Sequence, residues 1–126
     1  MDQAPVFDHE KLRVYRASLE FVTWAGDFLS ETDTKAAFKD QLDRASTSVP
    51  LNIAEGNAKW SFSDRSRFLR IAMGSALECA ACLDVAVAKR AADPARIVAG
   101  KQMLVGVVSM LSGLLQDSAS RLREEP

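Results

Sequence analysis

Two cysteines, Cys79 and Cys82, most directly suggest chemistry in this sequence, because their C-x-x-C spacing is used in redox and zinc sites. A redox pair needs its first thiol at a helix N-terminus, where free amides lower the thiol pKa, and the surrounding pattern places Cys79 inside a helix. A structural zinc site needs four ligands, and the single histidine, His9, is distant in the sequence. We interpret both cysteines as packing residues and predict no metal site.

No other residues form a recognisable catalytic arrangement. His9 lacks a serine, cysteine or acid at a spacing that would build a nucleophilic site, and it fits a solvated position at a helix start. Gly56 and Gly74 lack the clustered glycines and lysine of a phosphate-binding loop. The sequence therefore predicts no enzyme activity, no catalytic residue and no cofactor.

One group of basic residues is interleaved with aromatic residues, as in many nucleic-acid-binding surfaces. Guanidinium groups bind phosphate, and aromatic rings stack on unpaired bases. The candidate contact residues are Lys59, Trp60, Arg65, Arg67 and Arg70, with Phe62 among them. The alternative is that nearby acids, Glu55, Asp64 and Glu78, pair with these arginines and that the charges only solvate one end of the protein.

Composition indicates one globular domain rich in helix. The chain has 126 residues, of which 48% are hydrophobic and 26% charged, with only 4 Pro and 6 Gly. The formal net charge of −1 gives no long-range attraction to nucleic acid or an anionic membrane. The N-terminus lacks a basic segment followed by an apolar run, and charges or small residues interrupt the apolar stretches. We expect a cytoplasmic protein without a membrane partner.

Hydrophobic periodicity predicts four helices, at about 8–30, 35–55, 64–92 and 94–123. Several signals mark their ends: capping side chains at Asp33 or Thr34 and at Ser63, Gly56 as a stop, and Asp93 followed by Pro94 as a start. Long helices with short connections favour an all-α, up-and-down antiparallel four-helix bundle, a single domain over residues 1–126.

The first helix is apolar on two opposite faces. The stripe expected to enter the core is Leu12, Tyr15, Leu19, Val22, Gly26 and Leu29. A second stripe, about 200° around the helix at 3.6 residues per turn, contains Val14, Ala17, Phe21, Trp24 and Phe28. Monomers seldom expose such a patch, so Val14, Phe21, Trp24 and Phe28 are a candidate oligomer interface. The alternative is an irregular bundle that buries both faces.

Two segments of the chain resemble a known family. Residues 41–56, QLDRASTSVPLNIAEG, and residues 67–78, RFLRIAMGSALE, are similar to the signature of the bundle proteins encoded in 23S rRNA intervening sequences. Leu12, Val14, Tyr15 and Ala17 agree with the opening of that family. The family is similar in fold to the accessory variability proteins of diversity-generating retroelements, which form pentameric barrels and bind a reverse transcriptase and nucleic acid.

The resemblance implies a homo-oligomer, with a pentamer as the expected number, and no known enzyme activity. Our leading hypothesis is an assembly or adaptor protein that oligomerises into a ring and binds a protein partner. The alternative hypothesis is an RNA- or DNA-binding accessory factor of the intervening-sequence or retroelement type.

Overall fold

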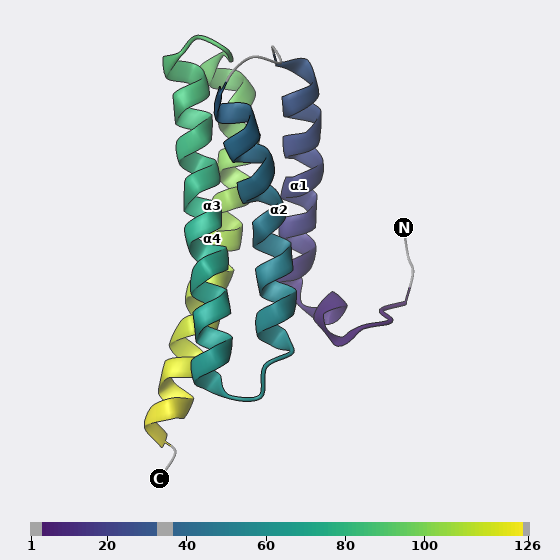
Figure 1. The fold of residues 1–126 in the computed structure, drawn as a ribbon, viewed down its shortest axis with the longest axis vertical. Helices are drawn as coiled ribbons and strands as arrows, with labels where there is room; N and C mark the ends of the chain where they lie inside the picture. The colour runs from purple at the N-terminus through teal and green to yellow at the C-terminus, as the bar shows by residue number, and fades with distance from the viewer. Residues whose placement is uncertain (1–3, 33–36, 125–126) are drawn as a thin grey trace.

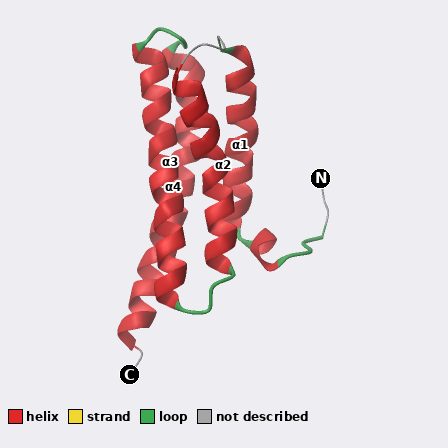
Figure 2. Ribbon diagram, in the orientation of Figure 1, coloured by secondary structure: helices red, strands yellow, loops and turns green. Residues whose placement is uncertain are grey.

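The computed structural model describes residues 4–32 and 37–124, with side chains described up to residue 117. A short 3-10 helix, η1 (Asp8–Lys11), precedes α1 (Arg13–Glu31), α2 (Ala37–Asn57), α3 (Phe62–Ala88) and α4 (Pro94–Glu124). Figure 2 shows these helices joined by loops, and the described residues contain no strand. The predicted all-α class is confirmed.

The four long helices form an up-and-down antiparallel bundle (Figure 1). Each helix packs against two others: α1 against α2 and α4, and α3 against α2 and α4. The bundle therefore closes through contacts between the first and last helices. The predicted single-domain four-helix bundle is confirmed.

The core contains the stripes that periodicity predicts for the second, third and fourth helices. Buried residues from these three helices include Phe38, Leu42, Val49, Ile53, Leu69, Ala76, Leu83, Ile97, Leu104 and Leu111. Val107 is fully buried, whereas its neighbour Val108 is only partly buried. Met73, Ala80, Val87 and Leu115 are also partly buried and pack against the core.

The structure buries the second stripe of α1 in the core, whereas Leu12, Tyr15 and Leu29 of the first stripe are only partly buried against it. Val14, Phe21 and Phe28 are between 1% and 3% exposed within one chain, and Trp24 is half-buried. Leu19, predicted to be in the core, is 41% exposed. The prediction of an oligomer interface at Val14, Phe21, Trp24 and Phe28 is therefore wrong, because these side chains already fill the interior of their own bundle.

Backbone conformation marks the start of α1, and a capping hydrogen bond marks the start of α3. The predicted first helix is interrupted at Leu12, whose backbone is extended (φ −76°, ψ 127°). Helix α1 therefore begins at Arg13. Helix α3 begins at Phe62, because the hydroxyl of Ser61 accepts a hydrogen bond from the amide of Asp64 at 3.1 Å. The predicted cap at Ser63 is therefore wrong. Pro94 begins α4 as predicted.

Helix α3 ends at Ala88, four residues earlier than predicted. Arg90 adopts a left-handed conformation (φ 61°). The amide of Ala91 bonds to the carbonyl of Ala86, and the amide of Arg90 bonds to that of Val87, which is the Schellman arrangement. The predicted caps of α2, Asp33 and Thr34, lie outside the described residues.

Candidate interaction surfaces

The aromatic residues of α1 form a structural cluster that joins this helix to α4. The indole of Trp24 stacks with Phe21 and Phe28, at centroid distances of 5.8 and 5.2 Å. It lies over Gly100 so closely that a Cβ atom there would be 2.5 Å from the ring. Gly100 is thus a notch in α4 that admits the indole. No sequence signal linked these two residues.

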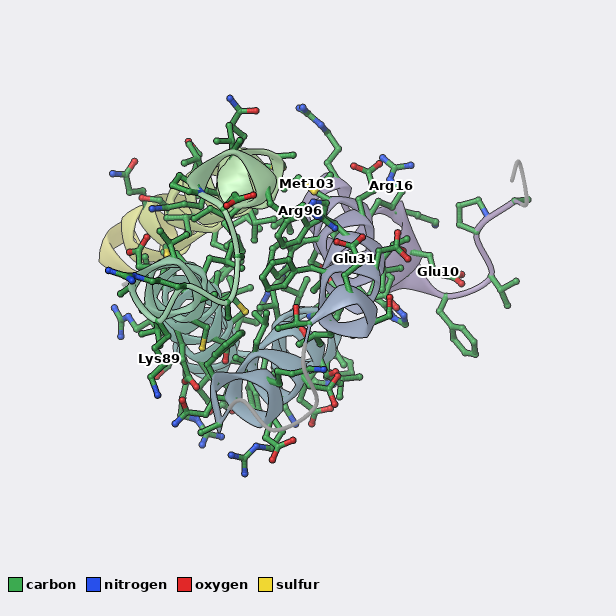
Figure 3. The ribbon with its side chains drawn as sticks, turned by 90° about the horizontal axis from the view of Figure 1, so that it is seen from above. Glu10, Arg16, Glu31, Lys89, Arg96 and Met103 are labelled. Atoms are coloured by element: carbon green, nitrogen blue, oxygen red, sulfur yellow. The ribbon has the colours of Figure 1, made fainter. Side chains whose placement is uncertain are left out.

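An ion pair crosses the same seam beside Trp24. The guanidinium of Arg96 binds the carboxylate of Glu31 through two bonds of 2.8 and 3.0 Å, and Figure 3 shows the two side chains meeting between α4 and α1. The bound guanidinium lowers the pKa of Glu31. Arg96 also lies over the rings of Trp24 and Phe28, at 5.1 and 5.5 Å. These contacts hold two helices together and give the predicted aromatic stripe a structural role.

The candidate nucleic-acid residues lie around the α2–α3 loop and the first turns of α3. Trp60 is fully exposed. Lys59 forms an ion pair with Glu55 at 3.1 Å, and its ammonium lies 5.1 Å from the centroid of the Phe68 ring. The guanidinium of Arg67 lies over the same ring at 4.7 Å. Phe68, which sequence reasoning missed, thus brings Lys59 and Arg67 together.

The other two arginines of the group differ in their surroundings. Arg70 is exposed, and of the described carboxylates none lies within ion-pair distance of Arg67 or Arg70. Arg65 is half-buried and lines a cavity of about 40 Å³ with Asn57 and Asp117. The structure therefore places an exposed tryptophan and two exposed arginines near one end of the bundle, with Arg65 in a more internal position.

The thiols are buried within one helix. Cys79 and Cys82 are 0% and 5% exposed and are both free. Burial is the largest cause that raises the pKa of Cys79, to about 12, and burial also raises the pKa of Cys82. A thiol that stays protonated at neutral pH is a poor nucleophile and a poor metal ligand. In the described part of the chain, no cluster of three His, Cys, Asp or Glu residues is suited to hold a metal ion.

Exposed apolar residues that sequence reasoning missed lie on α3 and α4, among charged residues such as Asp84 and Lys101, which form an ion pair of 2.6 Å between the two helices. We define this α3–α4 face by its exposed large residues, Ile71, Leu77, Val85, Val98 and Val105. Leu77 is 54% and Val105 70% exposed, and both line a groove of about 410 Å³ between the helices. In the sequence, Ile71, Leu77 and Val85 are six and eight residues apart, so they do not form a single stripe that hydrophobic periodicity reveals.

Helices α3 and α4 are both long and apolar. By length and composition alone, Phe62–Ala88 and Pro94–Asp117 could each cross a membrane, although only 33% and 28% of their most apolar windows are buried. The core helix of a soluble protein passes the same test. Both helices also supply core residues, including Leu83 and Leu111.

Fold and surfaces together define a single-domain helical bundle whose marked external feature is an apolar face. Comparison with protein families makes the assignment more specific, since the model of the 23S rRNA-intervening sequence protein family matches residues 10–113. The chain belongs to this family. The resemblance inferred from residues 41–56 and 67–78 is thereby confirmed.

A solved structure shows the same fold. The chain is similar to the crystal structure of a protein with unknown function from the S23 ribosomal protein family of Bacteroides thetaiotaomicron, with 20% sequence identity and a TM-score of 0.76. The match covers 81% of this chain and 97% of the other. Comparison with curated proteins gives no significant match.

Proposed function

We propose that this protein is a non-enzymatic assembly or adaptor protein that forms a homo-oligomer through the α3–α4 face. The observation that carries the proposal is the exposure of Leu77, Val105 and their apolar neighbours on two adjacent long helices. Contiguous apolar surfaces of this kind mark interaction sites. The occupant we assign to the face is a second copy of the chain.

The size of the face supports this assignment. A helix of 27 residues is about 40 Å long, and two packed helices present a surface roughly 20 Å wide, which together offer about 800 Å². A stable protein–protein interface of standard size buries about 800 Å² on each partner. The outer side of α3 and α4 as a whole, including charged residues such as Asp84 and Lys101, is therefore large enough for a lasting contact between two chains.

The family resemblance supplies the expected geometry, a ring of five chains in the cytoplasm. A ring repeats each surface of the subunit, so a protein partner would meet several identical sites and bind with avidity. Membership in the family of intervening-sequence proteins supports this proposal through the fold that its members share. The proposal involves no catalytic step and no membrane.

Charged substitutions on the face test the proposal. Leu77→Glu with Val105→Glu should reduce the mass in light scattering to that of one chain, 13.8 kDa, because burying two carboxylates is costly. The matched control is Leu51→Glu, since Leu51 is 63% exposed on α2, outside the face. Helicity should persist in both variants.

Two results would contradict the assembly proposal. One is a double variant that keeps the mass of the wild type. The other is a monomeric wild type that binds phosphatidylcholine vesicles and loses this binding in the double variant, which would assign the face to lipid.

A second function, contact with RNA or DNA, is favoured by one observation: Trp60 is fully exposed beside Lys59. Solvent-exposed indoles next to cationic groups suit stacking on unpaired bases. Affinity for single-stranded RNA should then fall steeply with salt, and Arg67→Ala with Arg70→Ala should flatten that slope by about two phosphate contacts. Absence of binding by the intact protein at low salt would exclude this function.

A further inference from the structure

The seam between α1 and α4 is open at the end where α1 begins. Helix α1 starts at Arg13, whereas α4 runs on to Glu124. Trp24 lies over Gly100, so two antiparallel helices with the same rise per residue place Arg13 level with about Leu111. Figure 1 shows the chain before α1 leaving the bundle to the side, while α4 continues past the start of α1. In the described chain, the α1 side of α4 therefore has no helix beside it from about this level onward.

A groove of about 340 Å³ lies at this open end of the seam. We call it the α1–α4 groove and define it by the residues that line it, which are Lys11, Leu12, Arg13 and Val14 on one side and Met110, Gly113 and Leu114 on the other. Its volume lies within the range of small-molecule sites, about 300–1,000 Å³. Gly113 contributes no side chain, and a Cβ atom there would have no contact within 4 Å. The groove therefore offers free space beside α4, bounded mostly by aliphatic side chains.

An internal cavity of about 40 Å³ lies behind the α1–α4 groove. Leu12 and Leu114 line both the groove and the cavity, and Asn57 and Arg65 form part of the inner wall. Protein cores are otherwise close-packed, so a side chain that moves inward usually meets other atoms. Here the side chain of Leu12 or Leu114 meets free space instead. The groove can therefore deepen around a ligand without disturbing the core.

Both charged residues that line the α1–α4 groove, Lys11 and Arg13, are cations. Of the described carboxylates, none lies within ion-pair distance of Arg13. The ammonium of Lys11 is 3.8 Å from the carboxylate of Asp8, and both side chains are mostly exposed, so this pair contributes little. The α3–α4 groove differs, because its Lys101 binds Asp84 at 2.6 Å. A guanidinium that is available to an anion thus lies at the edge of the α1–α4 groove.

We propose that the α1–α4 groove binds a free single-chain amphiphile with an anionic head, of the fatty-acid class. The carboxylate head binds the guanidinium of Arg13, which can donate two parallel hydrogen bonds to it. The alkyl chain lies along Met110 and Leu114, over Gly113, where it is removed from water. This site goes beyond the proposed function and does not depend on it, because it lies in the seam of α1 and α4 and not on the α3–α4 face.

Calorimetric titration of the full wild-type chain with decanoate and dodecanoate, each below its micelle-forming concentration, tests the ligand class. One molecule should bind per chain, and the affinity should rise about tenfold from decanoate to dodecanoate, because two more CH₂ groups are buried. Dodecanol has the same alkyl chain without the charge. It should bind about threefold to fivefold more weakly than dodecanoate at low salt, because the ion pair at Arg13 is exposed.

Substitutions at two glycines of α4 locate the site. Gly113→Leu should weaken dodecanoate binding at least about tenfold, because the new side chain takes the space of the alkyl chain. Gly106→Leu is the matched control, since a Cβ atom at Gly106 also has no contact within 4 Å but this residue does not line the groove. It should leave the affinity unchanged. Arg13→Gln should abolish the preference for dodecanoate over dodecanol and keep the dependence on chain length. Circular dichroism checks that each variant stays helical.

Three results would overturn this inference. Equal affinity of the wild type for decanoate and dodecanoate, or no binding of either, would show that the groove does not take an alkyl chain. Equal weakening by Gly113→Leu and Gly106→Leu would place the ligand elsewhere. If Gly113→Leu does not fold, an unchanged preference for dodecanoate over dodecanol in Arg13→Gln would still remove the head group from the site. None of these results alters the mass of the wild-type protein, so the assembly proposal would stand.

Discussion

Arg90 carries a local strain that the sequence does not reveal. Its left-handed backbone (φ 61°) completes the end of α3, a position where glycine is preferred because it has no Cβ atom. The alanine- and charge-rich stretch after Val87 continues the helical pattern, which is why sequence reasoning extended this helix to residue 92. In the structure the chain turns at Arg90, and the next helix starts at Pro94.

Arg90→Gly should therefore raise the free energy of unfolding by about 1 kcal/mol, since glycine adopts this conformation without steric cost. Lys89→Gly is the control, because Lys89 has an ordinary φ of −85° and should lose stability from the added freedom of the unfolded chain. Urea denaturation of both variants measures the difference. Equal destabilisation by the two substitutions would contradict the account of this turn.

Other residue-level interpretations depended on properties that are visible in the sequence. The mid-helix spacing of Cys79 and Cys82 was enough to predict packing thiols, and the structure buries both. The basic group at Arg65, Arg67 and Arg70 was also visible. The sequence did not show that Arg65 is half-buried, whereas Arg67 and Arg70 are exposed. Which arginine faces solvent depends on Phe68 and on the end of α4, and neither neighbour follows from local spacing.

At the scale of elements, the sequence predicted the number, order and direction of the helices and failed on which side of α1 enters the core. Both stripes of α1 have helical spacing, so periodicity offers two equivalent faces. The choice is made by a partner on another helix: Gly100 leaves room for the indole of Trp24, and Arg96 covers it. Contacts between residues this far apart in sequence leave no local pattern.

Two glycines of α4 test this explanation. Gly100→Ala should lower the free energy of unfolding by about 1–3 kcal/mol, because its methyl group would overlap the indole and displace it. Gly106→Ala should raise it by up to about 1 kcal/mol, since alanine favours helix and no atom lies within 4 Å of the added Cβ. Thermal or urea unfolding compares the two. If Gly100→Ala leaves the free energy of unfolding unchanged, the indole of Trp24 does not need the space that Gly100 leaves.

At the scale of the whole molecule, the bundle has two unlike sides. One carries the exposed side chains of Val6 and Phe7, and the other carries the α3–α4 face. Neither can bury its apolar residues within a single chain as it is folded. The proposed association between copies would remove apolar surface of both kinds from water.

The mass of the wild-type protein in solution tests the central claim most directly. Light scattering at micromolar concentration should give an integral multiple of 13.8 kDa, and five copies would correspond to about 69 kDa, as the family resemblance implies. The measurement requires no variant and no ligand. A mass of one chain, unchanged as the concentration is raised tenfold, would contradict the proposal that the α3–α4 face is an interface between copies.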